Sequence, residues 1–110
     1  MPQPTDEPRG KLVRDRIPQI IRANGAEPIT YTAGPAEYRR RLRDKLTEEV
    51  TEFLAADDAS APGELADVLE VVHAIAAHLG VDADQLQKIR AAKTRERGAF
   101  ADRIIWTGNQ

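Results

Sequence analysis

Hydrophobic residues recur along this chain mainly at helical spacing. Apolar positions three or four residues apart form stripes in four segments, and that period indicates amphipathic helices rather than strands. Gly25, Gly80 and Gly98 each follow one of these segments, where glycine commonly ends a helix. The pattern therefore predicts an all-α protein with helices at about 16–24, 35–56 and 83–97, and one that has Pro62 in its first turn and runs to about 79.

Capping signals refine the starts of three of these helices. Asp15 is the expected N-cap of the first, because Pro18 then falls in the first turn, where its missing N–H costs nothing. Ser60 or a neighbouring residue is expected to cap the third. Asp82 followed by Gln85 has the spacing of a capping box, in which each side chain bonds the backbone N–H of the other residue.

The segments outside the helices have a different character. Residues 27–32 contain β-branched and aromatic residues, so they are expected to be extended, and a short strand is one form that this could take. Residues 103–107 are also expected to be extended and could pair with residues 29–32. Residues 1–10 are polar and hold three prolines, which predicts a flexible leader to a single domain at 11–107. Short connections between long helices favour antiparallel neighbours. The predicted fold is a small antiparallel helical bundle with short extended terminal segments.

Composition narrows the functional classes. The chain has 110 residues, a net charge of −2 and no cysteine, which excludes disulfides, thiolate metal sites and a cysteine nucleophile. No run approaches the roughly 20 apolar residues of a membrane span, and the mild charge predicts neither a nucleic-acid nor a membrane partner. A cytoplasmic protein is expected. Its thin core predicts a homodimer or a higher homo-oligomer that buries a second apolar face.

Two sets of carboxylates lie at helical spacing on consecutive helices. Glu49 and Glu52 share one face of the second helix, and Glu64 and Asp67 share one face of the third. The break between these helices is short enough for a helical hairpin, which would bring the four carboxylates together. Their mutual repulsion would be relieved by a hard divalent cation with oxygen ligands, for which Mg2+ is the usual cellular candidate.

Glu49 carries most of this interpretation. On a helical wheel it lies near the centre of the apolar stripe that contains Leu42, Leu46 and Phe53, where an uncompensated carboxylate is costly. The alternative is that acidic runs on helices are usually solvated faces. Glu48 and Glu70 fit that alternative better, although either could act as a base or support the site from outside it.

Basic residues could complete a phosphate site. Lys93 and Arg97 continue the apolar face of the fourth helix, and Lys11 and Arg14 precede the first helix. Cations beside a bound Mg2+ are what polyphosphate recognition requires. For Arg97 the alternative is a favourable charge at a helix C-terminus. The arginines of residues 39–43 spread around their helix among acidic neighbours, which indicates a solvated face.

The acidic pattern resembles that of a known superfamily. Glu48-Glu49-x-x-Glu52 followed by Glu64-x-x-Asp67 is similar to the paired acidic motif of the all-α nucleoside triphosphate pyrophosphohydrolases, which include MazG-like, dUTPase-like and phosphoribosyl-ATP pyrophosphohydrolase-like proteins. Residues 11–18 and 93–100 resemble a compact, house-cleaning branch of nucleotide pyrophosphatases. The likeness covers roughly residues 11–106.

The resemblance implies a helical, Mg2+-dependent and usually oligomeric hydrolase. Such an enzyme splits nucleoside triphosphates, here non-canonical ones, into a nucleoside monophosphate and pyrophosphate. Carried over by position, the metal ligands for Mg2+, with Mn2+ as the alternative ion, are Glu49, Glu52, Glu64 and Asp67. The phosphate contacts would be Lys11, Arg14, Lys93 and Arg97, and a free carboxylate, Glu48 or Glu52, would accept the proton of the attacking water.

Two other functions stay open at this stage. Phosphoribosyl-ATP hydrolysis in histidine biosynthesis uses the same motif. A non-catalytic helical dimerisation module could instead use its carboxylates to bind a structural ion. The base preference is not encoded in any residue pattern of the sequence, because base selection depends on the shape of a pocket.

Overall fold

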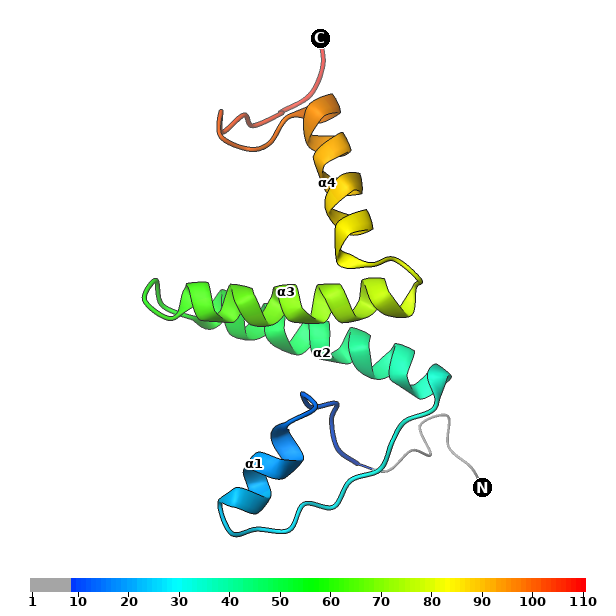
Figure 1. Ribbon diagram of the computed structural model, residues 1–110. Helices are drawn as coiled ribbons and strands as arrows, with labels where there is room; N and C mark the ends of the chain where they lie inside the picture. Colours follow the sequence, from blue (N-terminus) through cyan, green and yellow to red (C-terminus); the bar gives the residue numbers. More distant parts are fainter. Residues whose placement is uncertain (1–8) are drawn as a thin grey trace, which may run out of the picture. The chain divides into compact units, whose positions relative to one another are not determined.

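The computed structural model describes residues 9–110, and this part of the chain contains helices and no strand. The helices are α1 (Ile17–Ala23), α2 (Pro35–Ala55), α3 (Ala61–His78) and α4 (Ala83–Arg97) (Figure 1). The predicted all-α class is confirmed, and each predicted helix lies within about two residues of its observed bounds. Most of the predicted leader, residues 1–10, lies outside the described residues.

Contacts within the chain divide it into two compact units. One unit ends at Ile75 and the other begins at Ala76, so the boundary falls inside α3. The first unit contains α1, α2 and most of α3, and the second contains the end of α3, α4 and the C-terminal segment. No helix among the described residues is long and apolar enough to cross a membrane.

The start of α1 differs from the prediction. Arg16, and not Asp15, is the N-cap residue, and no side chain caps the helix. The first turn is closed instead by the backbone, because the N–H of Ile17 donates to the carbonyl oxygen of Arg14 at 3.0 Å. The predicted stop is confirmed: Gly25, with φ of 92°, follows the helix in a conformation that favours glycine.

The strand pairing considered for the extended segments does not occur among residues 9–110. Residues 26–34 and 103–110 have no regular secondary structure, and no strand occurs in residues 9–110. An isolated extended segment forms a strand only when a partner pairs with its backbone. β-branched composition alone therefore indicated an extended backbone but could not establish pairing.

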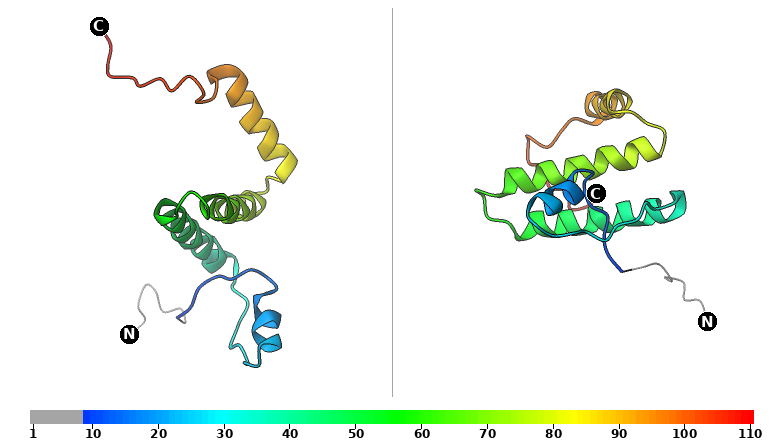
Figure 2. Two further views of the ribbon diagram at one scale, coloured as in Figure 1. Left: turned by 90° about the vertical axis from the view of Figure 1, so that its left-hand side faces the viewer. Right: turned by 60° about the horizontal axis from the view of Figure 1, so that its bottom comes forward.

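α2 and α3 form the antiparallel hairpin that organises the first unit. They lie side by side in each view (Figure 1 and Figure 2). Asp57 shapes the connection between them, because its Oδ1 accepts hydrogen bonds from the Ser60 N–H at 2.9 Å and from the Ser60 hydroxyl at 2.8 Å. These bonds hold the pKa of Asp57 below its usual range. At the start of α3, the Glu64 N–H donates to the Ser60 carbonyl oxygen.

The face that the hairpin buries is narrower than the predicted apolar stripes. Leu42 on α2 is 2% exposed and Val71 on α3 is 8% exposed. Other apolar residues of the two helices and of the turn after α3 are exposed: Val50, Leu54, Leu65, Leu69 and Leu79. A helix in a two-helix hairpin buries only the side that faces its partner, so a wide apolar stripe leaves part of itself exposed.

The second unit is built around α4. The predicted capping box is confirmed: Asp82 Oδ1 accepts from the Gln85 N–H at 2.8 Å, and Gln85 Oε1 accepts from the Asp82 N–H at 2.9 Å. The helix ends at Gly98, whose φ is 80°. Beyond it, the Trp106 indole N–H donates to oxygens of Gly108 and Asn109, and its ring is exposed.

Candidate functional site

Three carboxylates converge on the α2–α3 hairpin. Glu49 comes from α2, and Glu64 and Asp67 come from α3, where their separation of three residues places them on the same face. One carboxylate oxygen from each lies within 4.8 Å of the others. The hairpin thus brings together three of the four predicted metal ligands in a group that could hold a metal ion. We call Glu49, Glu64 and Asp67 the carboxylate group.

The burial of this group supports a bound cation. Glu49 is 7% exposed, and it is the charged residue that is buried in the described part of the chain. Glu49 Oε2 and Glu64 Oε2 are buried and have no hydrogen-bond partner among residues 9–110. A buried carboxylate oxygen without a partner costs about 1–3 kcal/mol or more. Oxygen-rich, negatively charged and unsatisfied, this site fits a hard divalent cation.

Glu52, the fourth predicted ligand, lies outside the carboxylate group. It is one turn further along α2 and is exposed. The charge of Glu49 raises the pKa of Glu52, and partial desolvation and the charges of Glu64 and Glu48 add to the effect. Glu52 is therefore close enough to share the electrostatic field of the group, while its side chain remains accessible to water.

Lys45 is a cation of this site that the sequence interpretation missed. Its Nζ lies 3.2 Å from Glu49 Oε1 and 3.2 Å from Glu48 Oε2, and its side chain is 17% exposed. Burial lowers the pKa of Lys45, but its bonds to Glu48 and Glu49 outweigh this and raise it. The available signal was the spacing of four residues between Lys45 and Glu49, which places both on one face of α2.

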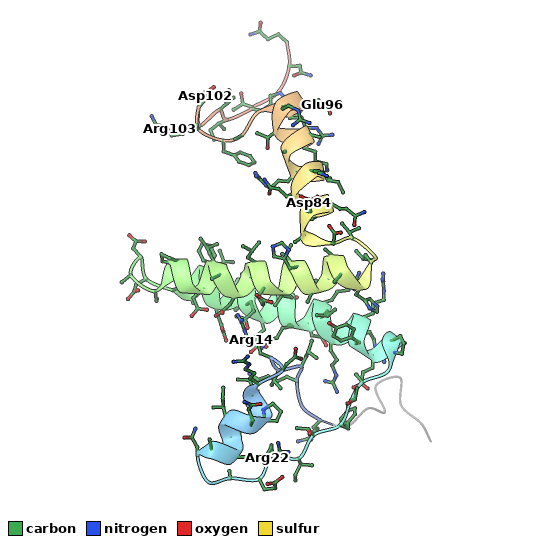
Figure 3. All side chains as sticks on the ribbon, viewed as in Figure 1. Arg14, Arg22, Asp84, Glu96, Asp102 and Arg103 are labelled. Carbon is green, nitrogen blue, oxygen red and sulfur yellow. The ribbon has the colours of Figure 1, made fainter. Side chains whose placement is uncertain are left out.

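The segment before α1 contributes two further cations, Lys11 and Arg14, whose predicted contact with phosphate stays a prediction. Lys11 Nζ donates to Glu48 Oε1 at 3.0 Å, and Arg14 Nη2 donates to Asp67 Oδ1 at 2.7 Å. Figure 3 shows Arg14 between α1 and the α2–α3 hairpin. The hydrogen bond from Lys11, together with that from Lys45, holds the pKa of Glu48 below its usual range. Both cations are more than half exposed and can therefore exchange partners readily.

Lys93 and Arg97 lie on α4, in the second unit, and are exposed. Their predicted contact with phosphate stays a prediction. His73 also stays outside the carboxylate group, although its Nδ1 is buried and has no partner among the described residues. Arg41, one of the arginines predicted to be solvated, is instead partly buried, and its Nε donates to Glu37 Oε2 at 3.1 Å.

A cavity adjoins the carboxylate group within the first unit. It has a volume of about 260 Å³, and Glu49, Asp67 and Lys45 lie on its wall. Its other walls include Leu42, Val71 and the segment 12–15. A second cavity of about 470 Å³ is lined by the same N-terminal segment, residues 29–33 and the Glu37–Arg41 pair.

Comparison with known proteins identifies the family. Residues 16–93 match the phosphoribosyl-ATP pyrophosphohydrolase family. The match covers well over half of the 110 residues, and it extends across the boundary between the two units. The chain therefore belongs to the phosphoribosyl-ATP pyrophosphohydrolase family, within the all-α, MazG-like nucleoside triphosphate pyrophosphohydrolase superfamily.

A relative from Mycolicibacterium smegmatis (strain ATCC 700084 / mc(2)155) is an uncharacterized protein that is 51% identical over 51 residues. The aligned stretch covers 46% of this chain and 52% of that protein, so the chain spans about half the length of this curated relative. No solved structure matches the chain.

Proposed function

We propose that this protein is a Mg2+-dependent nucleoside triphosphate pyrophosphohydrolase that converts non-canonical nucleoside triphosphates into a nucleoside monophosphate and pyrophosphate. One observation carries the proposal: the buried, unpartnered Oε2 of Glu49, in a carboxylate group with Glu64 and Asp67, in a chain of this family. A cation would satisfy the buried oxygens of this acidic group and neutralise its charge. The family match supports a nucleotide as the substrate.

The proposed metal ligands are Glu49, Glu52, Glu64 and Asp67, with Mg2+ as the ion and Mn2+ as the alternative. When bound, the ion would neutralise phosphate charge and lower the pKa of a coordinated water. The neighbouring carboxylates, Glu49 above all, repel the ionised form of Glu52 and raise its pKa, and a bound cation would relieve this repulsion.

The cations around the carboxylate group would bind the triphosphate. Arg14 presents a guanidinium, which suits bidentate contact with phosphate oxygens, and Lys11 presents a flexible ammonium. Both are exposed, so they can leave their carboxylate partners when the substrate arrives. We propose the same role for Lys93 and Arg97, on the strength of the sequence resemblance. These charges would stabilise the leaving pyrophosphate.

The base that accepts the proton of the attacking water would be a carboxylate that the metal leaves free, Glu48 or Glu52. Glu52 can take this role where the carboxylate group alone holds the ion, and Glu48 where Glu52 is also a ligand. Glu48 is held in place by its bonds to Lys11 and Lys45.

A second candidate function is the hydrolysis of phosphoribosyl-ATP, and the family match is the observation that favours it. Complementation of a histidine auxotroph separates the two, because only phosphoribosyl-ATP hydrolysis restores growth without histidine. A non-catalytic metal-binding module is the third candidate. Metal binding without turnover of any nucleotide would identify it.

The assembly is also part of the proposal. We propose a homodimer or a higher homo-oligomer of a single domain, residues 11–107, located in the cytoplasm and acting on nucleotides rather than on nucleic acid or membranes. The support is the exposed apolar face of the hairpin, which includes Leu54, Leu65 and Leu69. Burying such a face against a second copy would remove apolar surface from water.

The direct test is pyrophosphate release from a panel of standard and modified nucleoside triphosphates and phosphoribosyl-ATP, with Mg2+ and with EDTA. We expect release that requires the metal, with the nucleoside monophosphate as the other product. Release of orthophosphate, or release that persists in EDTA, would contradict the proposal. A preference for phosphoribosyl-ATP would instead support the second candidate function, the hydrolysis of phosphoribosyl-ATP.

A further inference from the structure

The cavity of about 260 Å³ beside the carboxylate group is chemically polarised along the hairpin. On α2 its wall runs from Glu49 to Tyr38, three turns or about 16 Å along the helix axis. On α3 it runs from Asp67 to Ala74, two turns or about 10 Å away. Because the helices are antiparallel, Glu49 on α2 and Asp67 on α3 belong to the same end of the cavity, and this end is charged. Tyr38 and Ala74 belong to the other end, which is uncharged on these two helices.

A nucleotide has the same polarity. Its triphosphate requires metal and cations, which are found at the end where Glu49 and Lys45 lie. Its base has apolar faces, and these match the other end, where Tyr38 offers an aromatic ring and Ala74 leaves room beside it. Leu42 and Val71 are buried between the two ends and form an apolar floor. Ligand sites of this kind, apolar with a few polar groups at defined points, are the usual ones in proteins.

Glu70 lies between the charged end and the uncharged end of the cavity. It lies on the cavity wall between Asp67 and Ala74 in sequence and shares the face of both by helical spacing. The oxygens of a carboxylate accept hydrogen bonds. At this level, between the phosphates and the base, the donors that a nucleotide offers are the hydroxyls of its sugar.

Building on the function proposed above, we propose that this cavity is the nucleoside subsite and that it favours ribonucleotides. The base packs against Tyr38 and Ala74 over the floor of Leu42 and Val71. The ribose hydroxyls donate to Glu70, and the triphosphate extends to the carboxylate group. The substrate class is therefore a ribonucleoside triphosphate, with the 2′-hydroxyl recognised by Glu70.

The test measures binding rather than turnover. The probes are the α,β-methylene analogues of ATP and UTP, their 2′-deoxy counterparts and inorganic tripolyphosphate, each titrated calorimetrically with Mg2+. Ala74→Leu adds bulk inside the cavity, and the matched control Ala66→Leu adds the same bulk at an exposed position of α3 outside it. Tyr38→Ala, which removes the ring, is a second variant in case Ala74→Leu destabilises the hairpin.

We expect Ala74→Leu and Tyr38→Ala to weaken both nucleotide analogues by about tenfold or more, a loss of about 1.4 kcal/mol, while tripolyphosphate binds as in the wild type. Ala66→Leu should bind all probes normally. If Ala74→Leu bound the nucleotide analogues as tightly as the wild type, the assignment of this cavity as the nucleoside subsite would be overturned. The metal and phosphate site would survive that result, because tripolyphosphate binding reports on it separately.

Glu70→Gln tests the sugar contact. The wild type should bind the ribonucleotide analogues several-fold more tightly than their 2′-deoxy counterparts, and Glu70→Gln should bring the ratio close to one. A ratio unchanged by Glu70→Gln, or a wild type that prefers the deoxy analogues, would overturn the assignment of the ribose to Glu70.

Discussion

Lys45 Nζ lies 3.2 Å from Glu49 Oε1, so the most buried carboxylate of the candidate site is half satisfied: one oxygen has an ammonium partner, and Oε2 has none among the described residues. The same ammonium contacts Glu48. Lys45 therefore holds two neighbouring carboxylates of α2 in place. It balances part of the negative charge that a divalent cation would balance more completely.

This relationship predicts how Lys45→Met behaves. Without metal, Glu49 loses its partner, and we expect a loss of about 1–3 kcal/mol in the free energy of unfolding. Excess Mg2+ should recover more stability in Lys45→Met than in the wild type, because the ion compensates a larger uncancelled charge. Thermal unfolding in EDTA and in Mg2+ measures both effects.

Lys88→Met is the matched control for that experiment. Lys88 also pairs with an acid four residues away, Asp84, at 3.0 Å, but both side chains are exposed (Asp84 is labelled in Figure 3). Exposed helix pairs contribute about 0.3–0.5 kcal/mol. Equal losses for Lys88→Met and Lys45→Met would show that burial gives Lys45 no special role.

Arg14→Gln tests the phosphate contact of the N-terminal segment. The change removes the guanidinium 2.7 Å from Asp67, and we expect it to weaken Mg2+-dependent binding of inorganic tripolyphosphate by about tenfold, since charge-assisted bonds contribute about 1.5–3 kcal/mol. Arg22→Gln is the control, because Arg22 pairs with Glu27 on the far end of α1 (Figure 3). If Arg14→Gln bound tripolyphosphate as tightly as the wild type, the assignment of Arg14 to the phosphate site would be wrong.

The Tyr31–Glu37–Arg41 cluster predicts a pH dependence of stability away from the metal site. The hydrogen bond from Tyr31 holds the pKa of Glu37 below its usual range; partial burial opposes this effect, and Arg41 adds to it. A depressed folded-state pKa stabilises the protein above the unfolded-state value, and this stabilisation disappears as the pH falls through the folded-state pKa. Glu37→Gln should therefore lower the melting temperature at pH 7 and lose that effect in acid.

The control for this prediction is Glu27→Gln, since Glu27 forms an exposed ion pair with Arg22. The melting temperature of Glu27→Gln should stay close to that of the wild type at neutral and at acidic pH. If the loss of melting temperature in Glu37→Gln grew as the pH falls through the acidic range, its sign would be wrong for a depressed pKa, and the assignment would be contradicted.

The helices were predictable because their signals are local. Gly25, Gly80 and Gly98 mark helix ends, and the Asp82–Gln85 capping box needs only residues three apart. A strand depends on pairing with a second segment that can lie far away in the sequence. Residues 27–32 have no such backbone pairing within residues 9–110. Asp15 is not the cap, because the backbone hydrogen bond from the Ile17 N–H to the Arg14 carbonyl oxygen closes the turn without it.

The candidate site was predictable to the extent that helical spacing determines it. The wheel placed Glu49 in a buried face, and the hairpin brought it to Glu64 and Asp67. The wheel could not decide which part of a wide apolar stripe the hairpin buries, and Leu65 and Leu69 on α3 are exposed. Lys45 was missed because its spacing to Glu49 is also that of a common solvated pair, and burial distinguishes the two cases only in three dimensions.

The most direct test of the central claim is pyrophosphate release by Glu49→Gln beside the wild type and Glu96→Gln, which changes an exposed glutamate of α4 (Figure 3). With Mg2+ and the best nucleotide of the panel, Glu49→Gln should lose about 100-fold or more in kcat. Its helical circular dichroism should match that of the wild type, and Glu96→Gln should remain fully active. A folded Glu49→Gln that releases pyrophosphate at the wild-type rate would contradict the metal site and the function proposed from it.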